Sequence, residues 1–132
     1  MLLDDLSGKL AVDGVGVLNT SIFTGSAANL PEGDGPFLVL IETGGMQGIR
    51  VQNQTAMRLR QPMVQIVTVG KSYAATLQMA LAAFVSLDGV FNAVLGTTFY
   101  QRIVARQEPT DTGLDNVKRS RFSFNVEITK NP

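Results

Sequence analysis

Cysteine and histidine are both absent from this 132-residue chain. Without cysteine there is no disulfide, no thiolate nucleophile and no cysteine-ligated zinc. Without histidine the chain lacks the commonest general base, the commonest metal ligand and every nucleophile–histidine pair. An enzyme with this sequence would have to use carboxylates, lysine or tyrosine. We therefore expect a protein that is not an enzyme and that needs no cofactor or metal.

Long uninterrupted apolar segments are missing as well. The most apolar stretch, residues 77–95, is broken by Gln78, Asp88, Gly89 and Asn92, whereas a membrane-spanning helix needs about 20 mainly apolar residues. The first residues also lack the basic and apolar regions of a signal peptide. We expect a soluble chain made in a cytoplasm, with no membrane partner.

What is present is enough apolar material for one folded domain. The hydrophobic fraction is 45% and the charged fraction is only 17%, which is typical of a globular chain with a real core rather than of a disordered tail. A length of 132 residues fits a single domain spanning residues 1–132.

Charge is unevenly placed along the chain although its formal sum is zero. Residues 1–49 contain one base and six acids, a net charge of −5, and residues 50–106 contain six bases and one acid, a net charge of +5. One interpretation is a pair of complementary faces that meet in a head-to-tail oligomer. The alternative, equally open, is that the two segments fold side by side and neutralise each other.

Apolar residues at helical spacing predict two helices. The first contains Leu2, Leu3, Leu6 and Leu10 and ends before Gly14. The second has Ser72 as its N-cap and ends at Asp88–Gly89. Its apolar stripe is formed by Tyr73, Leu77, Ala80, Leu81 and Phe84.

The remaining segments alternate between strands and turns. We expect strands at 21–24, 37–41, 63–69, 99–106 and 122–129, a hairpin turn near Gly96, irregular loops at 26–35 and 109–116, and a projecting hairpin or loop at about 44–61. The run at 37–41 is apolar throughout, which favours a central strand covered on both faces. In the last strand, Phe122, Phe124, Val126 and Ile128 are predicted to point inward.

In the strand at 99–106, alternation predicts one face with Phe99, Ile103 and Ala105, and the other with Tyr100, Arg102, Val104 and Arg106. The predicted fold is a single α+β domain in which a mixed, mainly antiparallel sheet packs against two helices in the order α-β-β-β-α-β-β-β.

Three short motifs are better explained by structure than by ligand binding. Gly70-Lys71-Ser72 follows a strand, but the first glycine of a phosphate-binding loop is replaced by Gln65, so we expect a turn and a helix cap. Gly44-Gly45 is predicted to be a tight exit turn after its strand. Asp111 and Asp115 are too few for a calcium loop and are interpreted as surface charge.

Arginines are the candidate contact residues of this chain. Arg50, Arg58 and Arg60 lie close together in the sequence, and Arg102 and Arg106 share a strand face. They could contact nucleic-acid phosphates or acidic protein surfaces. Because the chain is neutral and its phenylalanines fall mostly at core positions, protein contact is favoured. We predict an oligomer or partner interface at Arg50, Arg58, Arg60 and Arg106.

Three ordered groups of segments, covering nearly the whole chain, resemble the phage tail-terminator family, also called minor capsid proteins, of long-tailed phages and related particles. They are 14–25 (GVGVLNTSIFTG) with 38–45 (LVLIETGG); 61–73 (QPMVQIVTVGKSY) with 87–89 (LDG); and 103–109 (IVARQEP) with 113–116 (GLDN) and 122–128 (FSFNVEI). Residues 48–60 do not resemble the family closely.

The resemblance implies a virion protein of the tail, at the head–tail interface, that is assembled in the host cytoplasm. It would form a homo-oligomeric ring, expected to be a hexamer, on the end of the tail tube. The ring would stop tube polymerisation and offer a docking surface to the head. Its partners would be further copies of itself, the major tail tube protein and a head-completion or connector protein, with DNA only passing through the ring lumen. A head–tail connector or stopper is the first alternative and a nucleic-acid-binding module the second.

Overall fold

The computed structural model describes the backbone of residues 2–25, 33–50, 57–114 and 118–131, and the side chains of these residues except 45–50 and 57–59. Two helices and seven strands follow one another along the chain. They are α1 (Leu2–Val12), β1 (Ile22–Thr24), β2 (Phe37–Arg50), β3 (Met57–Gly70), α2 (Tyr73–Leu87), β4 (Val90–Leu95), β5 (Thr98–Ala105), β6 (Thr110–Leu114) and β7 (Ser120–Lys130).

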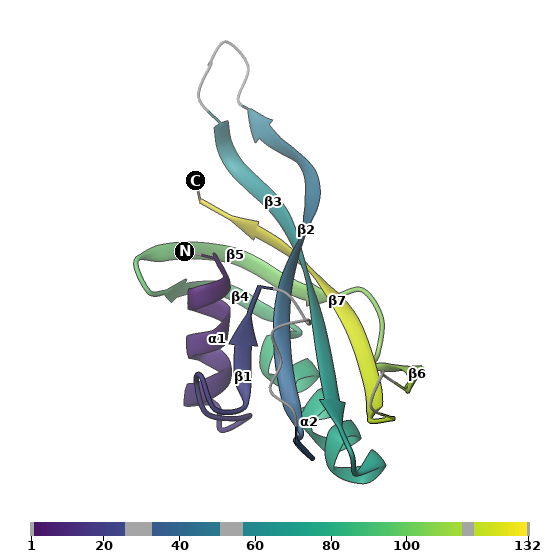
Figure 1. Cartoon of the computed structure of the whole chain (residues 1–132). Coiled ribbons are helices and arrows are strands. Elements are labelled where there is room, and N and C mark those ends of the chain that lie inside the picture. The colour runs from purple at the N-terminus through teal and green to yellow at the C-terminus, as the bar shows by residue number, and fades with distance from the viewer. Residues whose placement is uncertain (1, 26–32, 51–56, 115–117, 132) are drawn as a thin grey trace.

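The strands form one strongly twisted sheet in the order β1-β2-β3-β7-β5-β4, with β6 paired to β7. β1 runs parallel to β2, and the other pairs are antiparallel. Both helices contribute to a core on the same face of the sheet (Figure 1). The predicted α+β fold, with a mixed and mainly antiparallel sheet, is confirmed.

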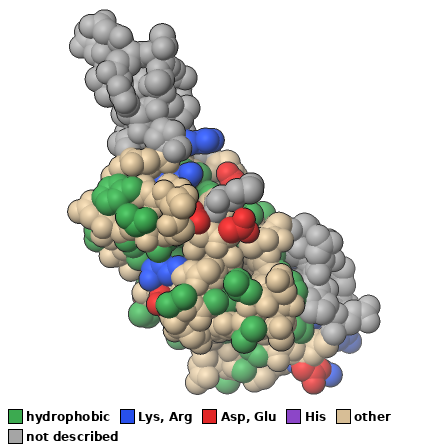
Figure 2. All heavy atoms as spheres, turned by 90° about the vertical axis from the view of Figure 1, so that its left-hand side faces the viewer, with side chains coloured by type: hydrophobic (Ala, Val, Ile, Leu, Met, Phe, Trp, Pro, Cys, Tyr) green, Lys and Arg blue, Asp and Glu red, His purple; other side chains and the backbone are tan. Residues whose placement is uncertain are grey.

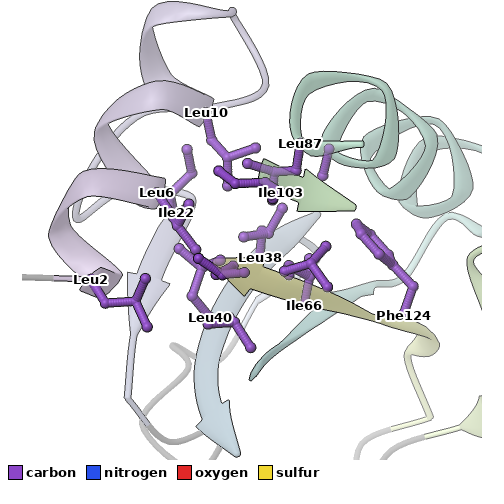
Figure 3. Packing of buried hydrophobic residues seen from close by; sticks show 14 of the residues in the cluster. Leu2, Leu6, Leu10, Ile22, Leu38, Leu40, Ile66, Leu87, Ile103 and Phe124 are labelled. Atoms are coloured by element: carbon purple, nitrogen blue, oxygen red, sulfur yellow. The ribbon is translucent and has the colours of Figure 1, made fainter. Parts of the chain in front are cut away.

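The main core lies between this sheet face and the helices. Leu2, Leu6 and Leu10 recur on one side of α1 and are buried against β1 and β2 (Figure 3). Fully burying each such side chain contributes about 1.5–3 kcal/mol. α2 begins where Ser72 accepts a hydrogen bond from the Ala75 backbone N–H. β7 alternates as predicted, with Phe122, Phe124, Val126 and Ile128 buried.

A smaller apolar cluster occupies the opposite face of the sheet. Val39, Val67 and Val69 are buried there, and Phe23 and Ile41 pack against them. Because Leu38 and Leu40 are buried on the helical face, both faces of this part of β2 are covered. This confirms the expectation drawn from the apolar run at 37–41.

β2 and β3 continue past the body of the domain as a two-stranded arm, here residues 43–50 and 57–63 (Figure 1). β7 accompanies β3 as far as the pair Arg60–Lys130, whereas the pairing of β2 with β3 continues to Arg50 and Met57. The prediction that Gly44-Gly45 forms an exit turn is wrong. A bulge lies between Glu42 and Gly45, and Gly44 has a φ of +86°, a conformation that glycine adopts without strain, so the strand bends and goes on.

The predicted faces of β5 are also wrong in part. Tyr100 and Ile103 are both fully buried in the main core, although strict alternation places them on opposite faces. The pairing of β5 with β7 shifts register between Tyr100 and Arg102. An extra residue at this bulge reverses the alternation that follows it, so both side chains point to the helices.

The segment predicted as a loop at 109–116 contains β6. β5 covers the edge of β7 only as far as Val126, and β6 pairs with the remaining edge through Thr110–Ser123 and Asp111–Phe122. All five β6 residues are exposed. A strand that buries no side chain has no apolar alternation in its sequence, which is why the pattern did not indicate it.

Candidate assembly interface

The arm and the sheet next to it gather basic residues from four strands. Arg50 lies on β2 and Arg58 and Arg60 lie on β3. Arg60 is in register with Lys130 on β7, and Arg102 on β5 is in register with Thr129. Arg102 also lines a groove of about 120 Å³ at the arm base, together with Gln61, Pro62, Met63, Glu127, Ile128 and Thr129.

Three of the four predicted interface residues therefore belong to one structural unit. The backbone positions of Arg50 and Arg58 are on the arm, while their side chains lie outside the described set; Arg60 is exposed. Arg106 lies outside the arm, directly after β5, where its N–H donates to the Asn125 carbonyl over 2.8 Å. Its side chain reaches Glu127, which lines the groove at the arm base.

Arg106 has a local partner in the domain. Its Nη1 lies 3.4 Å from Oε1 of Glu127, and the two side chains are 53% and 38% exposed. The sequence patterns did not single out Lys130, and they grouped Arg102 with Arg106. The signal that connects Arg102 and Lys130 with the arm is the register of β7 with β3 and β5, which only the folded sheet reveals.

A second surface surrounds α1 on the helical side of the molecule (Figure 2). One groove, of about 420 Å³, runs between α1 and the turn joining β4 to β5, and it is lined by Asp4, Asp5, Gly8, Lys9, Val12, Asp13, Val94, Leu95 and Gly96. Another, of about 630 Å³, lies between α1 and α2 and is lined by Lys9, Asp13, Leu81, Ala82, Val85 and Ser86. The grooves share Lys9 and Asp13, so they form one surface, here called the α1 surface.

Asp13 is the polar centre of the α1 surface. Lys9 donates to its Oδ2 over 2.8 Å and Ser86 donates to the same oxygen over 2.5 Å. The Lys9 hydrogen bond, followed by the Ser86 bond, lowers the pKa of Asp13 below its usual range. Through the Ser86 bond, Asp13 joins the end of α1 to α2.

The motifs interpreted as structural have local roles in the fold. Lys71 follows β3, and its backbone N–H donates to the Asp34 carbonyl over 2.7 Å. Asp111 accepts a 2.8 Å hydrogen bond from the Gly113 N–H, while Asp115 lies outside the described residues. Within the part of the chain that the structure describes, no three potential metal-ligating side chains gather at one place, and no helix there has the length and apolarity needed to span a membrane.

The fold resembles that of a known particle component. A chain of the solved structure described as "Virion of native gene transfer agent (GTA) particle" superposes with a TM-score of 0.65 and 14% sequence identity, over 99% of this chain and 95% of that chain. Comparison of the sequence with protein-family models and with curated proteins finds no match. At this identity the similarity establishes a shared fold, extending over nearly the full length of both chains.

Proposed function

We propose that this chain is a structural subunit of a phage-like virion. The observation that carries the proposal is the fold similarity to a chain of a gene transfer agent virion, which spans 99% of this chain and 95% of the other. Because both chains are covered almost end to end, the similarity concerns the whole subunit. A subunit of this kind acts through contacts with other virion proteins, without catalysis, and is localised in the particle.

The specific role that we propose is that of a tail terminator. The ordered sequence segments that resemble that family support this role, and so does the presence of two different surfaces on one subunit. A ring with cyclic symmetry and head-to-tail contacts needs two unlike, complementary surfaces on each copy. The basic arm and the α1 surface, with its three carboxylates, have these properties.

In this role copies of the chain close a ring on the last layer of the tail tube, where they stop further polymerisation and bind the head side of the particle. The partners are other copies, the tube protein and a head-completion protein, and DNA passes through the lumen. A connector on the head side would use the same ring architecture, so the choice between the two roles depends on which partner is bound.

The test combines light scattering and negative-stain imaging of the purified chain with its cognate tail tubes. We expect rings with a central hole, bound to one end of each tube, and shorter tubes when the chain is present during polymerisation. A chain that stays monomeric at all concentrations and does not bind tubes would contradict the proposed function. Binding only to head particles would identify a connector instead.

A further inference from the structure

The α1 surface exposes four large apolar side chains from three elements. Val12 on α1 is 86% exposed, Val85 and Leu81 on α2 are 76% and 44% exposed, and Val94 on β4 is 65% exposed. All four line the two grooves that meet at Lys9 and Asp13. Single exposed apolar residues are normal, but a group of them around connected grooves is typical of a protein-binding surface.

The charge of this surface is negative. Asp4, Asp5 and Asp13 line the grooves with one base, Lys9, which gives a net charge of −2. Asp4 and Asp5 also lie in the first turn of α1, where acids stabilise the helix dipole. That local role does not neutralise them, so the grooves present carboxylates beside apolar side chains.

The arm has the opposite charge and also contains apolar residues. Residues 43–50 and 57–63, its described strands, include Arg50, Arg58 and Arg60 and no acid, a net charge of +3, together with apolar residues such as Ile49 and Leu59. The arm extends beyond both helices of its own subunit (Figure 1). Its position on the molecule therefore suits contact with a neighbour.

We propose that the arm of one copy lies on the α1 surface of the next copy. This contact brings the net positive arm against the net negative α1 surface and covers Val12 and Val94. This contact deepens the proposed function and rests on it, because it specifies the head-to-tail contact of the ring. Repeated around an axis, it uses one arm and one α1 surface per copy and leaves neither unoccupied.

Site-specific cross-linking tests the contact directly, because the chain has no native cysteine. Arg58→Cys and Val12→Cys variants are mixed and treated with a short bis-maleimide. We expect covalent dimers from the mixture, and a ladder up to the closed ring from the double variant. Arg58→Cys mixed with Leu114→Cys is the matched control, since Leu114 on β6 is 66% exposed but lies outside both grooves; this mixture is expected to give no dimer.

Charge substitution gives an independent readout. Val94→Lys adds a base to the α1 surface at a 65% exposed position, and Leu114→Lys adds the same base at a 66% exposed position elsewhere. Because like charges across an interface cost several kcal/mol, Val94→Lys should weaken self-association at least about tenfold. Leu114→Lys should leave it unchanged. Arg58→Glu combined with Val94→Lys should recover part of the loss.

The outcomes separate this inference from the function on which it rests. Rings that form normally while the Arg58–Val12 pair gives no cross-link, or while Val94→Lys has no more effect than Leu114→Lys, would overturn the proposed contact and leave the ring intact. Cross-linked dimers without rings would support the contact and contradict the terminator role. Cross-linking of Arg58→Cys to the tube protein in place of Val12→Cys would assign the arm to that partner and overturn the inference.

Discussion

The hydroxyl of Tyr100 donates a 2.7 Å hydrogen bond to Oδ2 of Asp5 and so ties β5 to the first turn of α1. The two residues are 95 positions apart in the sequence. The Tyr100 side chain is fully buried in the main core, and Asp5 lines the groove beside α1. Burial, followed by the bond to Asp5, raises the pKa of Tyr100 above its ordinary value. This pair therefore connects the core to the α1 surface.

Tyr100→Phe should lower the free energy of unfolding by about 1–2 kcal/mol at pH 7, because the bond to Asp5 is lost. The raised pKa also predicts an alkaline effect. Above about pH 10 the unfolded chain loses the tyrosine proton while the folded chain keeps it, so the wild type should lose up to about 1.4 kcal/mol of stability per pH unit. Tyr100→Phe should not show this alkaline loss of stability. Urea unfolding between pH 7 and 11 measures both effects.

Tyr73→Phe is the control for Tyr100→Phe. Tyr73 is 54% exposed and its ring makes an edge contact with Phe122, which phenylalanine keeps. Its effect should stay within about 0.5 kcal/mol. An equal loss of stability at alkaline pH in the wild type and in Tyr100→Phe would show that deprotonation of Tyr100 is not its cause.

Asp13→Asn should lower stability slightly at neutral pH and not at all in strong acid. The pKa of Asp13 is lowered in the folded state, so its contribution is present above the ordinary carboxylate pKa and disappears as the pH falls through the lower folded value. Since the Lys9–Asp13 pair is partly exposed, the difference at pH 7 should be only about 0.5 kcal/mol. Parallel urea titrations at pH 7 and pH 2 measure it, with Asp111→Asn as the matched control at an exposed position outside the α1 surface, where asparagine keeps the oxygen that accepts from the Gly113 N–H.

Gly70→Ala and Gly8→Ala should have opposite effects on stability. A Cβ at Gly70 would lie 2.9 Å from Cα of Pro36 and in contact with Oγ1 of Thr76, so the substitution should cost about 1–3 kcal/mol. Gly8 is inside α1 and has open space for a Cβ, so alanine there should stabilise by about 0.5–1 kcal/mol. Thermal unfolding of both variants measures the contrast, and stabilisation by Gly70→Ala would contradict the packing described.

Charge reversal on the arm should affect association and not folding. The double variant Arg58→Glu/Arg60→Glu changes two residues of an arm that lies outside the main core, so its melting temperature should match that of the wild type while self-association weakens. Lys71→Glu is a matched control, because Lys71 is exposed and lies away from the arm at the other end of β3. Association is measured by light scattering at several salt concentrations, since added salt screens exposed charges. A lower melting temperature with unchanged association would show that these arginines serve the fold.

Much of the fold was predictable because local sequence and tertiary packing agree. The leucines of α1 recur on one helical face, Ser72 can cap only the turn that follows it, and β7 alternates without interruption. Each of these patterns can be recognised within a few neighbouring residues, because the repeat of the helix or strand determines which side chains are buried. The placement of two helices against a mixed sheet then followed from the order of the elements.

The errors fall where strands are irregular or bury nothing. The bulges after Glu42 and Tyr100 each shift the alternation by one residue. The glycine pair at 44–45 is the local signal of the first bulge and was interpreted as a turn, whereas no glycine marks the second. β6 pairs through its backbone with all side chains exposed. For the candidate interface, the sheet register adds Arg102 and Lys130 to the arm base, and Arg106 pairs with Glu127, which lines the groove there.

By itself the sequence determined the fold class, the two helices and the side chains that β7 buries. It also determined the distribution of charge along the chain, which is acidic at the beginning and basic in the middle. Only the tertiary structure decided that three acids of the first segment line grooves beside exposed valines and that Arg102 and Lys130 lie at the base of the arm. The physical reason is that the repeat of a helix or strand determines which of its own side chains point inward. A surface, in contrast, is formed by strands and helices that meet only after the chain has folded.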